Sequence, residues 1–407
     1  MASGHDIAGP NERLMSIGRL FGLLAAFCVL LELTLMSRAP FIERDFDLQD
    51  IIDLHRLTGY GVLLSISAHV VFLTISYAAG SLSLWAQFLD FNNHYEDILM
   101  ATIGTGVFFL ATSLSVRIIR TNIRYELWYV VHLTIYLAIV LTFLHQIPNG
   151  NDFIGSPWFT AFWYGLYGFV TLIWAWYRVL RPYWLAIKYD FRVYAVERAA
   201  ANTYSVFLTG RNIQRFKFQP GQYANWRIMA RGLWTESHPF SISSPIDNGL
   251  LRFTAKVSGS YTAKLRDLKP GARVLVDGPR GNFGADRAEL TSKAVLIGGG
   301  IGVAPFLSTA NMLLRQRKQV TLLYAAKTMS DVAFINELRA LQPFGLTIRL
   351  YVSEYNIHIT REVLAQYAVE DTTIYICGPD GMSKAFQKTL KELGFPKQRV
   401  IIERFAY

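Results

Sequence analysis

The sequence has few charged residues, few cysteines and, over its first half, no lysine. Charged residues make up 17% of the 407 residues and hydrophobic residues 52%. A soluble protein of this length usually carries about a quarter charged residues. The apolar and aromatic content excludes a disordered, collagen-like or coiled-coil chain, and the two cysteines, Cys28 and Cys377, are too few for a disulfide scaffold. These absences leave a protein that lies at least partly in a membrane.

The charges that are present lie mostly in the second half. Residues 1–182 contain ten arginines, 13 acidic residues and no lysine, and the first lysine is Lys188. Residues 183–407 contain the other 30 basic residues and 17 acidic ones. The formal charge of +10 therefore describes a soluble second half. It favours a surface that faces anionic lipid or an anionic cofactor, with no nucleic-acid partner.

Five apolar segments in the first half are long enough to cross a lipid bilayer, which takes about 20 helical residues. They are residues 14–36, 53–77, 98–117, 126–147 and 158–180. The loops 78–97 and 148–157 have no basic residue. Basic residues follow the third and fifth segments, namely Arg117, Arg120, Arg124, Arg178, Arg181 and Lys188. Because basic loops stay in the cytoplasm, we expect an integral membrane protein with its second half in the cytoplasm and its amino terminus outside.

Four of the eight histidines lie inside two of these segments: His55 and His69 in one, His132 and His145 in the other. Coordinating side chains inside a span are costly and usually functional. His55 and His69 are 14 residues apart, which places them ~21 Å apart along a helix and within ~40° of one face. The second and fourth segments run in the same direction, so His55 and His132 are expected at an inner level and His69 and His145 at an outer one. This arrangement predicts two stacked bis-histidine haems, with hydrogen bonding between helices as the alternative.

One spacing does not fit a regular helix. His132 and His145 are 13 residues apart, which places them ~140° apart around the helix axis. Either this helix contains an irregular turn, or its two haems lie on different sides.

Past residue 188 the pattern changes to short strands. Alternating segments at residues 190–199, 202–210, 221–229 and 251–257 predict an antiparallel β-barrel that ends near residue 288. From residue 293 onward, strands alternate with helical stretches. These strands are expected at residues 293–300, 319–326, 346–354, 372–379 and 399–405. They predict a parallel, doubly wound α/β sheet that binds its ligands at the carboxyl ends of the strands.

Two turns of this sheet indicate a dinucleotide. The sequence GGGIGVAP at residues 298–305 follows an apolar strand and opens a helix, so its glycines let backbone N–H groups approach a pyrophosphate. The turn Cys377-Gly378-Pro379 ends a later strand and is expected to border the nicotinamide, a plain strand-to-helix turn being the alternative. Lys327 follows the strand 319–326 where an acidic residue would favour NADH. It favours NADPH, although a solvated lysine would leave NADH usable as well.

Two segments of the expected barrel suit a flavin. His238-Pro239-Phe240-Ser241 offers an aromatic face and a hydroxyl group. Gly259-Ser260-Tyr261-Thr262 could open a short helix onto the flavin diphosphate. We therefore expect a multi-domain chain: a transmembrane di-haem helical bundle over 1–186, an antiparallel β-barrel FAD domain over 187–290 and a doubly wound NAD(P)H-binding α/β domain over 291–407.

Together these motifs resemble one superfamily over nearly the whole chain, from residue 14 to 405. The first half resembles the ferric reductase-type haem domain shared by NADPH oxidases and ferric-chelate reductases, and the second half resembles the ferredoxin–NADP reductase module fused to it. The motifs are H-x13-H, H-x12-H, GQY, HPFS, GGGIGVAPF and CGP. The resemblance implies two b-type haems on His55, His69, His132 and His145. It implies FAD on His238, Pro239, Phe240, Ser241, Gly259 and Thr262, with Gln222 and Tyr223 nearby. It implies NAD(P)H on Gly298, Gly299, Gly300, Gly302, Pro305, Lys327, Cys377, Gly378 and Pro379.

The resemblance also implies residues near the reaction centres. An aromatic residue near the end of the chain stacks on the flavin in this family, which points to Phe405, with Tyr407 as the alternative. Arg19 occupies a place comparable to an arginine near the outer haem, whereas Leu73 stands where animal oxidases have a further histidine. Those oxidases have six spans where we count five. Only 13 residues precede the first span, so we expect no built-in calcium control and see no sign of a regulatory subunit.

The expected function is electron transfer across a membrane, from cytoplasmic NAD(P)H through FAD and two haems to an acceptor outside. Oxygen giving superoxide is the first choice of acceptor, a ferric chelate the second, and a protein or quinone partner the third. A haem-bearing membrane anchor or sensor with an inactive reductase module is an alternative of another class. A transporter fits poorly, because its site would require broken helices at the membrane midplane.

Overall fold

The structure, a computed structural model, describes residues 9–43, 46, 48–78, 82–116, 122, 125–281, 283 and 291–404. The chain divides into two units by its internal contacts. The first holds the residues up to Ala39 together with Asp50–Trp176, and the second holds Pro40–Gln49 and the residues from Tyr177 onward. The arginines expected in the loop after the third span, at positions 117, 120 and 124, lie outside the described residues.

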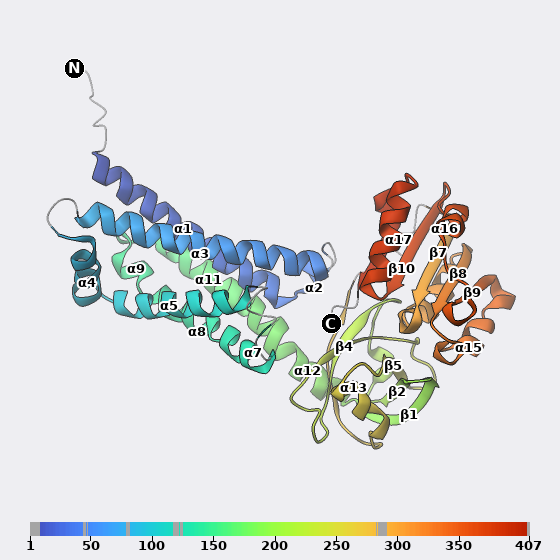
Figure 1. The fold of residues 1–407 in the computed structure, drawn as a ribbon. Helices are drawn as coiled ribbons and strands as arrows, with labels where there is room; N and C mark the ends of the chain where they lie inside the picture. Colours follow the sequence, from blue (N-terminus) through green and yellow to red (C-terminus); the bar gives the residue numbers. More distant parts are fainter. Residues whose placement is uncertain are drawn as a thin grey trace. The chain divides into compact units, whose positions relative to one another are not determined.

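The first unit is helical (Figure 1). Its helices are α1 (Pro10–Ser37), α3 (Leu48–Ala78), α4 (Leu84–His94), α5 (Ile98–Ser115), α7 (Tyr125–Leu133), α8 (Ile135–Leu144), α9 (Gln146–Asn149), α10 (Asn151–Ile154) and α11 (Pro157–Ala175). Within the described ranges, four segments are long and apolar enough to cross a membrane: Pro10–Ser37, Asp50–Ala78, Ile98–Ser115 and Leu127–Asn149. The protein is therefore an integral membrane protein.

The fifth expected span is the exception, because helix α11 is not among these four. Its 19 residues include three tryptophans and two tyrosines, whose polar N–H and O–H groups lower the mean hydropathy. The helix packs against α1 instead: Trp163 meets Ala26, and Val170 meets Leu30 and Leu33. Four spans, where the sequence predicted five, are thus supported by length and composition.

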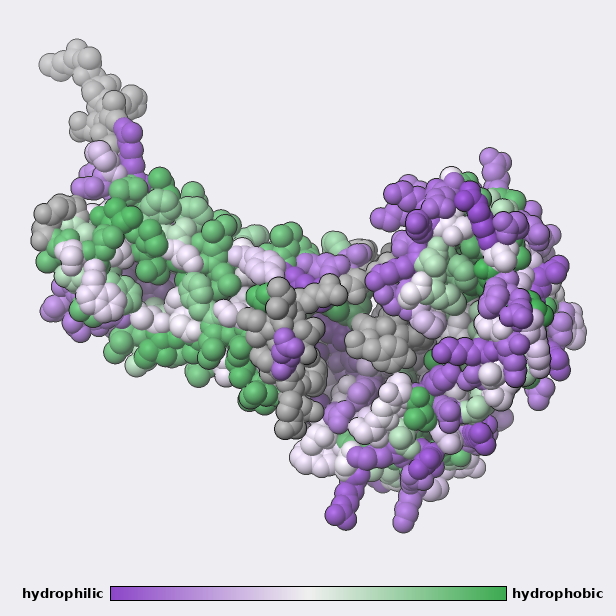
Figure 2. Space-filling model, viewed as in Figure 1, coloured by the Kyte–Doolittle hydropathy of each residue, from purple (hydrophilic) through white to green (hydrophobic). Residues whose placement is uncertain are grey.

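The outward faces of these helices are apolar. Leu64, Leu137, Phe169 and Leu172 are all exposed, and Figure 2 shows mostly hydrophobic side chains over this unit and mostly hydrophilic ones over the second. Lipid can solvate such faces, since every backbone group within a helix already has its hydrogen bond.

The helix that carries His132 and His145 is interrupted between them. Helix α7 ends at Leu133 and α8 begins at Ile135. At Thr134 the backbone N–H donates to the carbonyl of Val131, three residues earlier, over 3.0 Å. A regular α-helix would bond four residues back. Of the two alternatives that the 13-residue spacing left open, the irregular turn is therefore present.

The second unit begins with α2 (Pro40–Glu43) and α12 (Arg181–Tyr189), followed by two three-stranded antiparallel sheets. One sheet has the order β1-β2-β5 (Arg192–Ala200, Thr203–Thr209, Leu251–Lys256) and the other β4-β3-β6 (His238–Ser241, Tyr223–Ile228, Val274–Arg280). They enclose a core in which Trp226, Phe253 and Phe240 stack. The sequence did not predict β4 and β6, because Pro239 and the Gly278-Pro279 pair are unusual inside strands.

A five-stranded parallel sheet follows, with the order β11-β10-β7-β8-β9. Its strands are β7 (Lys293–Gly299), β8 (Gln319–Ala326), β9 (Leu346–Val352), β10 (Thr372–Gly378) and β11 (Val400–Arg404). Helix α14 (Phe306–Arg315) packs on one face through Ala310 and Leu313. Helices α16 (Arg361–Tyr367) and α17 (Asp380–Glu392) pack on the other face through Leu364 and Leu390. The expected fold class is confirmed: a helical membrane bundle, antiparallel sheets and a doubly wound α/β sheet.

Candidate functional site

The four membrane histidines meet as two pairs. The ring centres of His55 and His132 are 6.0 Å apart with their planes at 84°, and those of His69 and His145 are 6.3 Å apart with their planes at 47°. Helix α3 supplies the first member of each pair. The other members are His132, in the last turn of α7, and His145, directly after α8. The pairing by level that the sequence predicted is what the structure contains.

Both inner histidines have side-chain partners at Nδ1. His55 Nδ1 is hydrogen-bonded to the carboxylate of Glu32 on α1. His132 Nδ1 lies 3.2 Å from the hydroxyl oxygen of Ser115, which also accepts a 3.0 Å bond from the Trp128 indole N–H. That hydroxyl gives its own proton to the carbonyl of Ala111 over 2.7 Å. It can therefore only accept from His132, whose Nδ1 must carry the hydrogen.

The outer histidines have weaker partners. His69 Nδ1 donates to the backbone carbonyl of Gly18 over 2.8 Å. Gly22, one turn further along α1, leaves the space for the ring, because a Cβ there would lie 2.7 Å from His69 Nδ1. His145 Nδ1 is buried without a well-formed hydrogen bond to a described residue; the carbonyl of Thr142 lies nearby.

These contacts suit axial metal ligands. An imidazole that donates from Nδ1 keeps its lone pair on Nε2, and a ligating histidine usually gives its other N–H to a carbonyl or carboxylate. With metal–imidazole bonds of about 2 Å, two rings that share one iron have their centres ~6 Å apart, as both pairs do. The donor set and its spacing therefore fit two bis-imidazole irons. The sequence did not single out Glu32, although it is the one acidic residue in the segment 14–36.

Arg19 lies beside Gly18 on α1, at the level of the outer pair. Its side chain is half-buried, and Nη2 donates to the sulfur of Met15 over 3.0 Å. Leu73 contacts the position that a Cβ on Gly18 would take, so it packs between α3 and α1. The oxygen-site role of Arg19 stays a prediction.

The residues predicted to hold a flavin lie on two paired strands. Tyr223 of β3 pairs with Ser241 of β4, and the indole of Trp226 donates to the carbonyl of Phe240 over 3.0 Å. Gln222 Nε2 donates to the carbonyl of Gly281 over 3.1 Å. Pro239 faces Asn225 in the register of the same strand pair.

A ring contact connects this strand pair to the second predicted flavin segment. The ring centre of His238 lies 4.0 Å from that of Tyr261 in α13 (Ser260–Lys264). Burial raises the pKa of Tyr261 to about 12, so it stays a neutral phenol. The Thr262 hydroxyl accepts from the backbone N–H groups of Ser258 and Gly259, over 2.9 and 3.1 Å. The structure thus gathers the two segments on one side of the antiparallel sheets.

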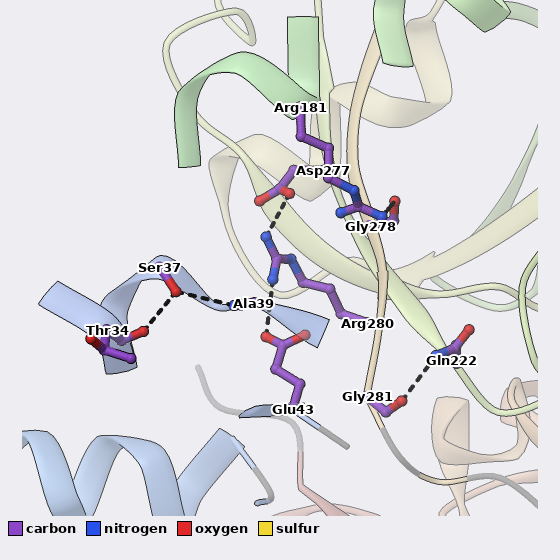
Figure 3. A network of polar contacts seen from close by, with 10 residues as sticks. All are labelled: Thr34, Ser37, Ala39, Glu43, Arg181, Gln222, Asp277, Gly278, Arg280 and Gly281. Atoms are coloured by element: carbon purple, nitrogen blue, oxygen red, sulfur yellow. Dashed lines mark hydrogen bonds and ion pairs between the residues drawn. The ribbon is translucent and has the colours of Figure 1, made fainter. Parts of the chain in front are cut away.

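A buried ion-pair network lies behind the predicted flavin residues (Figure 3). Arg280, at the end of β6, is almost fully buried, with Nη1 3.1 Å from the Glu43 carboxylate of α2 and Nη2 2.6 Å from Asp277. Arg181 donates to the carbonyl of Gly278 over 3.0 Å. Removing one partner of a buried pair costs several kcal/mol, so this network fixes α2 and the end of β6 to each other. No pattern in the sequence linked residues 43 and 280.

The two glycine-rich turns of the parallel sheet meet each other. Gly298 pairs with Cys377 across β7 and β10. A Cβ on Gly302 would lie 2.2 Å from the carbonyl oxygen of Cys377, and one on Gly378 would lie 3.0 Å from Cα of Gly299. Gly300 has a φ of +54°, which glycine adopts most readily. These glycines are therefore required for the close approach of two strand ends, where a doubly wound sheet binds its ligand.

Three further residues that were predicted to bind the nucleotide differ in their surroundings. Cys377 is fully buried within strand β10, and burial raises the pKa of its thiol well above the usual value, so it remains neutral. Lys327 is exposed after β8, and Pro305 precedes α14. Phe405 and Tyr407, the candidates for a stacking aromatic, lie outside the described residues.

Three family models match consecutive parts of the chain. A ferric reductase like transmembrane component matches residues 21–143, an FAD-binding domain matches residues 189–283, and an oxidoreductase NAD-binding domain matches residues 296–388. The first covers three of the four membrane histidines. The other two cover the predicted flavin segments and the two glycine-rich turns.

Individual relatives match smaller shares of the chain. Flavohemoprotein A of Dictyostelium discoideum is 31% identical over 147 residues, 34% of this chain and 37% of its own length. The electron transfer subunit of dihydroorotate dehydrogenase B from Geobacillus kaustophilus is 32% identical over 193 residues, 46% of this chain and 72% of its own length. Among solved structures, a ferredoxin reductase of carbazole 1,9a-dioxygenase aligns with a TM-score of 0.47 and 24% identity, over 53% of this chain and 68% of that one.

Proposed function

Because the chain belongs to the NADPH oxidase and ferric reductase superfamily, we propose that it is a transmembrane flavocytochrome. It carries electrons from cytoplasmic NAD(P)H through FAD and two b-type haems to O2 on the far side of a bacterial plasma membrane, giving superoxide. The main support for the proposal is that four histidines form two facing pairs at two levels of the helical bundle. The ring centres are 6.0 Å apart in one pair and 6.3 Å apart in the other. In coarser terms the protein is a membrane-bound NAD(P)H-dependent oxidoreductase.

Each bound group has its own residues in this proposal. When bound, the flavin takes electrons from NAD(P)H as a hydride and releases them singly, as the one-electron haems require. His55 with His132 would hold the inner haem, and His69 with His145 the outer. The proposed domains are 1–186, 187–290 and 291–407. The flavin residues are Gln222, Tyr223, His238, Pro239, Phe240, Ser241, Gly259 and Thr262, with Phe405 as the stacking ring. The nucleotide residues are Gly298, Gly299, Gly300, Gly302, Pro305, Lys327, Cys377, Gly378 and Pro379.

The proposed ligands bear on how an acceptor would be reduced. With two histidines on each iron, no coordination position would remain open, so an acceptor would receive its electron at the edge of the outer haem. Oxygen can react in this way, and Arg19 on α1 could attract the superoxide product. A ferric chelate is the second candidate. It is favoured by Leu73, which stands where the animal oxidases of this superfamily have a further histidine, and by the name of the matching membrane family.

One experiment separates these acceptors. Purified protein loaded with haem and FAD is mixed with NADPH, or with NADH in a parallel sample, without air. Haem absorption is followed before and after air is admitted, with cytochrome c reduction in the presence and absence of superoxide dismutase. Rapid reoxidation with a dismutase-sensitive signal supports the oxidase. Haem that stays reduced in air and is reoxidised by a ferric chelate supports the reductase. Haem that NAD(P)H never reduces contradicts the proposal and favours a haem-bearing anchor or sensor.

A further inference from the structure

The inner and outer pairs differ in the charge of the group behind their first histidine. His55 Nδ1 meets a carboxylate, that of Glu32, whereas His69 Nδ1 meets an uncharged backbone carbonyl, that of Gly18. Both partners come from α1, and they are separated by the same 14 residues that separate the two histidines. Helix α1 therefore presents one group to each histidine of α3, and only the inner group is ionisable.

The Glu32 carboxylate sits in a formed site on α3. Its Oε1 is within hydrogen-bonding distance of the hydroxyl of Thr58, one helical turn from His55, and that hydroxyl can alternatively donate to the carbonyl of Leu54 over 2.8 Å. Its Oε2 meets the imidazole of His55. The carboxylate side chain is 14% exposed. A carboxylate inside a membrane span is costly and needs a function or a partner, and here both of its oxygens are engaged by α3.

We propose that Glu32 is a positioning residue that orients His55 toward the inner haem and lowers the reduction potential of that haem below that of the outer one. This inference rests on the proposed function, because it assigns a role toward a haem on His55 and His132. A carboxylate that accepts the Nδ1 hydrogen fixes the tautomer and makes Nε2 a stronger electron donor. Its negative charge also opposes the arrival of an electron on the iron in a medium of low dielectric constant.

The consequence is directional. An electron on the inner haem would lie near the Glu32 carboxylate, whereas an electron on the outer haem would lie near the uncharged backbone carbonyl of Gly18. Movement from the inner to the outer level is then favourable without any change in iron ligands. A single glutamate on α1 would give the conduit its outward preference.

The test is a spectroscopic redox titration of the purified, haem-loaded full chain. In Glu32→Gln, which keeps the size and an acceptor oxygen, the inner step should move to higher potential. The equilibrium constant for electron transfer between the two haems should change at least tenfold, which corresponds to a shift of ~59 mV for one electron. The outer step should not move. A parallel titration of His69→Leu, which lacks an outer ligand, identifies the inner step.

Asp53→Asn is the matched control. It also removes one carboxylate, two residues from His55 in the sequence. Asp53, however, is exposed and pairs with Arg56 over 3.3 Å, so this substitution should move neither redox step. Glu32→Asp, which keeps the charge, should restore most of the low potential. The inference is overturned if Glu32→Gln binds two haems and neither redox step moves, or if both steps move together. It is also overturned if Asp53→Asn shifts the inner step by the same amount.

Two outcomes need separate treatment. If Glu32→Gln does not retain haem, Thr58→Val provides the test. Without the Thr58 hydroxyl the carboxylate interacts more strongly with His55, so the inner step alone should move to lower potential, and an unmoved step overturns the inference. If the unmodified protein binds fewer than two bis-histidine haems, the proposed function is itself wrong and this inference falls with it.

Discussion

The two units of the chain hold their predicted cofactor residues in different ways. In the membrane unit the important groups are single side chains on helices. Three of the four histidines are hydrogen-bonded to a residue of another helix: His55 to Glu32, His69 to Gly18 and His132 to Ser115. In the second unit the important groups are turns at strand ends, and glycines such as Gly302 permit their contact. The membrane site should therefore fail when one side chain is removed, and the nucleotide site when one is added.

The largest effect is expected from removing an outer ligand. His69→Leu should lower the haem content from two per chain to one and stop reduction of an external acceptor, while NADPH still reduces the flavin and the remaining haem. Haem quantification and anaerobic spectra measure both results. The control is His94→Gln, because His94 is exposed and paired with Asp90 on α4. Two haems retained in His69→Leu would contradict the assignment of this pair.

The corresponding change in the second unit adds a methyl group. Gly302→Ala would place a Cβ 2.2 Å from the backbone oxygen of Cys377, so the two glycine-rich turns must separate. We expect the NADPH dissociation constant to rise at least ~10-fold, about 1.4 kcal/mol, with unchanged haem spectra. Gly381→Ala is the control, since nothing lies within 4 Å of the added atom. Unchanged nucleotide affinity in Gly302→Ala would show that this contact does not shape the site.

A smaller effect is expected at Ser115. Ser115→Ala removes the hydroxyl that accepts the Nδ1 hydrogen of His132 and the indole hydrogen of Trp128. Each of these partly buried hydrogen bonds should contribute about 1 kcal/mol. The variant should melt earlier and lose haem from the inner pair first, which thermal scans at the haem absorption band would detect. Ser67→Ala, whose hydroxyl bonds Leu63 of its own helix, should melt like the unmodified protein. If the two variants melted at the same temperature, the hydrogen bond between His132 and Ser115 would not stabilise the inner site.

The smallest effect concerns the connection between the antiparallel and parallel sheets. Lys256 of β5 donates to Asp331, 2.8 Å away, and this bond lowers the pKa of the Asp331 carboxyl. A carboxyl with a lowered pKa stabilises the fold above its unfolded pKa, and this contribution is lost as the pH falls through the folded value. Asp331→Asn should therefore cost under about 1 kcal/mol at pH 7, and the difference should vanish at acid pH. Melting curves of both proteins against pH would check this, and a difference that grows on acidification would contradict it.

Much of the fold followed from local patterns in the sequence. Apolar length gave the spans, and the 14-residue spacing of His55 and His69 gave the two levels. The 13-residue spacing of His132 and His145 left two alternatives, of which the structure contains the irregular turn, at Thr134. Strand β8 was predicted at its observed bounds, because its apolar run is continuous. Helix α11 was expected as a span from the length of its apolar segment, yet its tryptophans and tyrosines give it too low a hydropathy to count among the four.

The partners of the site residues could not be predicted in the same way. Glu32 and His55, Ser115 and His132, and Glu43 and Arg280 are each brought together by tertiary packing, and no periodicity links their positions. Glu32 could have been noticed in the sequence, because an acidic residue inside an apolar segment is costly unless it has a partner or a function. Strands β4 and β6 were missed because they contain proline.

We propose that electrons cross the membrane through the two histidine pairs, and proteoliposomes test this most directly. Oxidised cytochrome c is trapped inside the vesicles and NADPH is added outside, with matched vesicles that contain His69→Leu. We expect the unmodified protein to reduce the trapped cytochrome c, in molecules whose second half faces outward, and the His69→Leu vesicles to reduce none. Reduction at equal rates in both preparations, or reduction only of cytochrome c added outside, would contradict it.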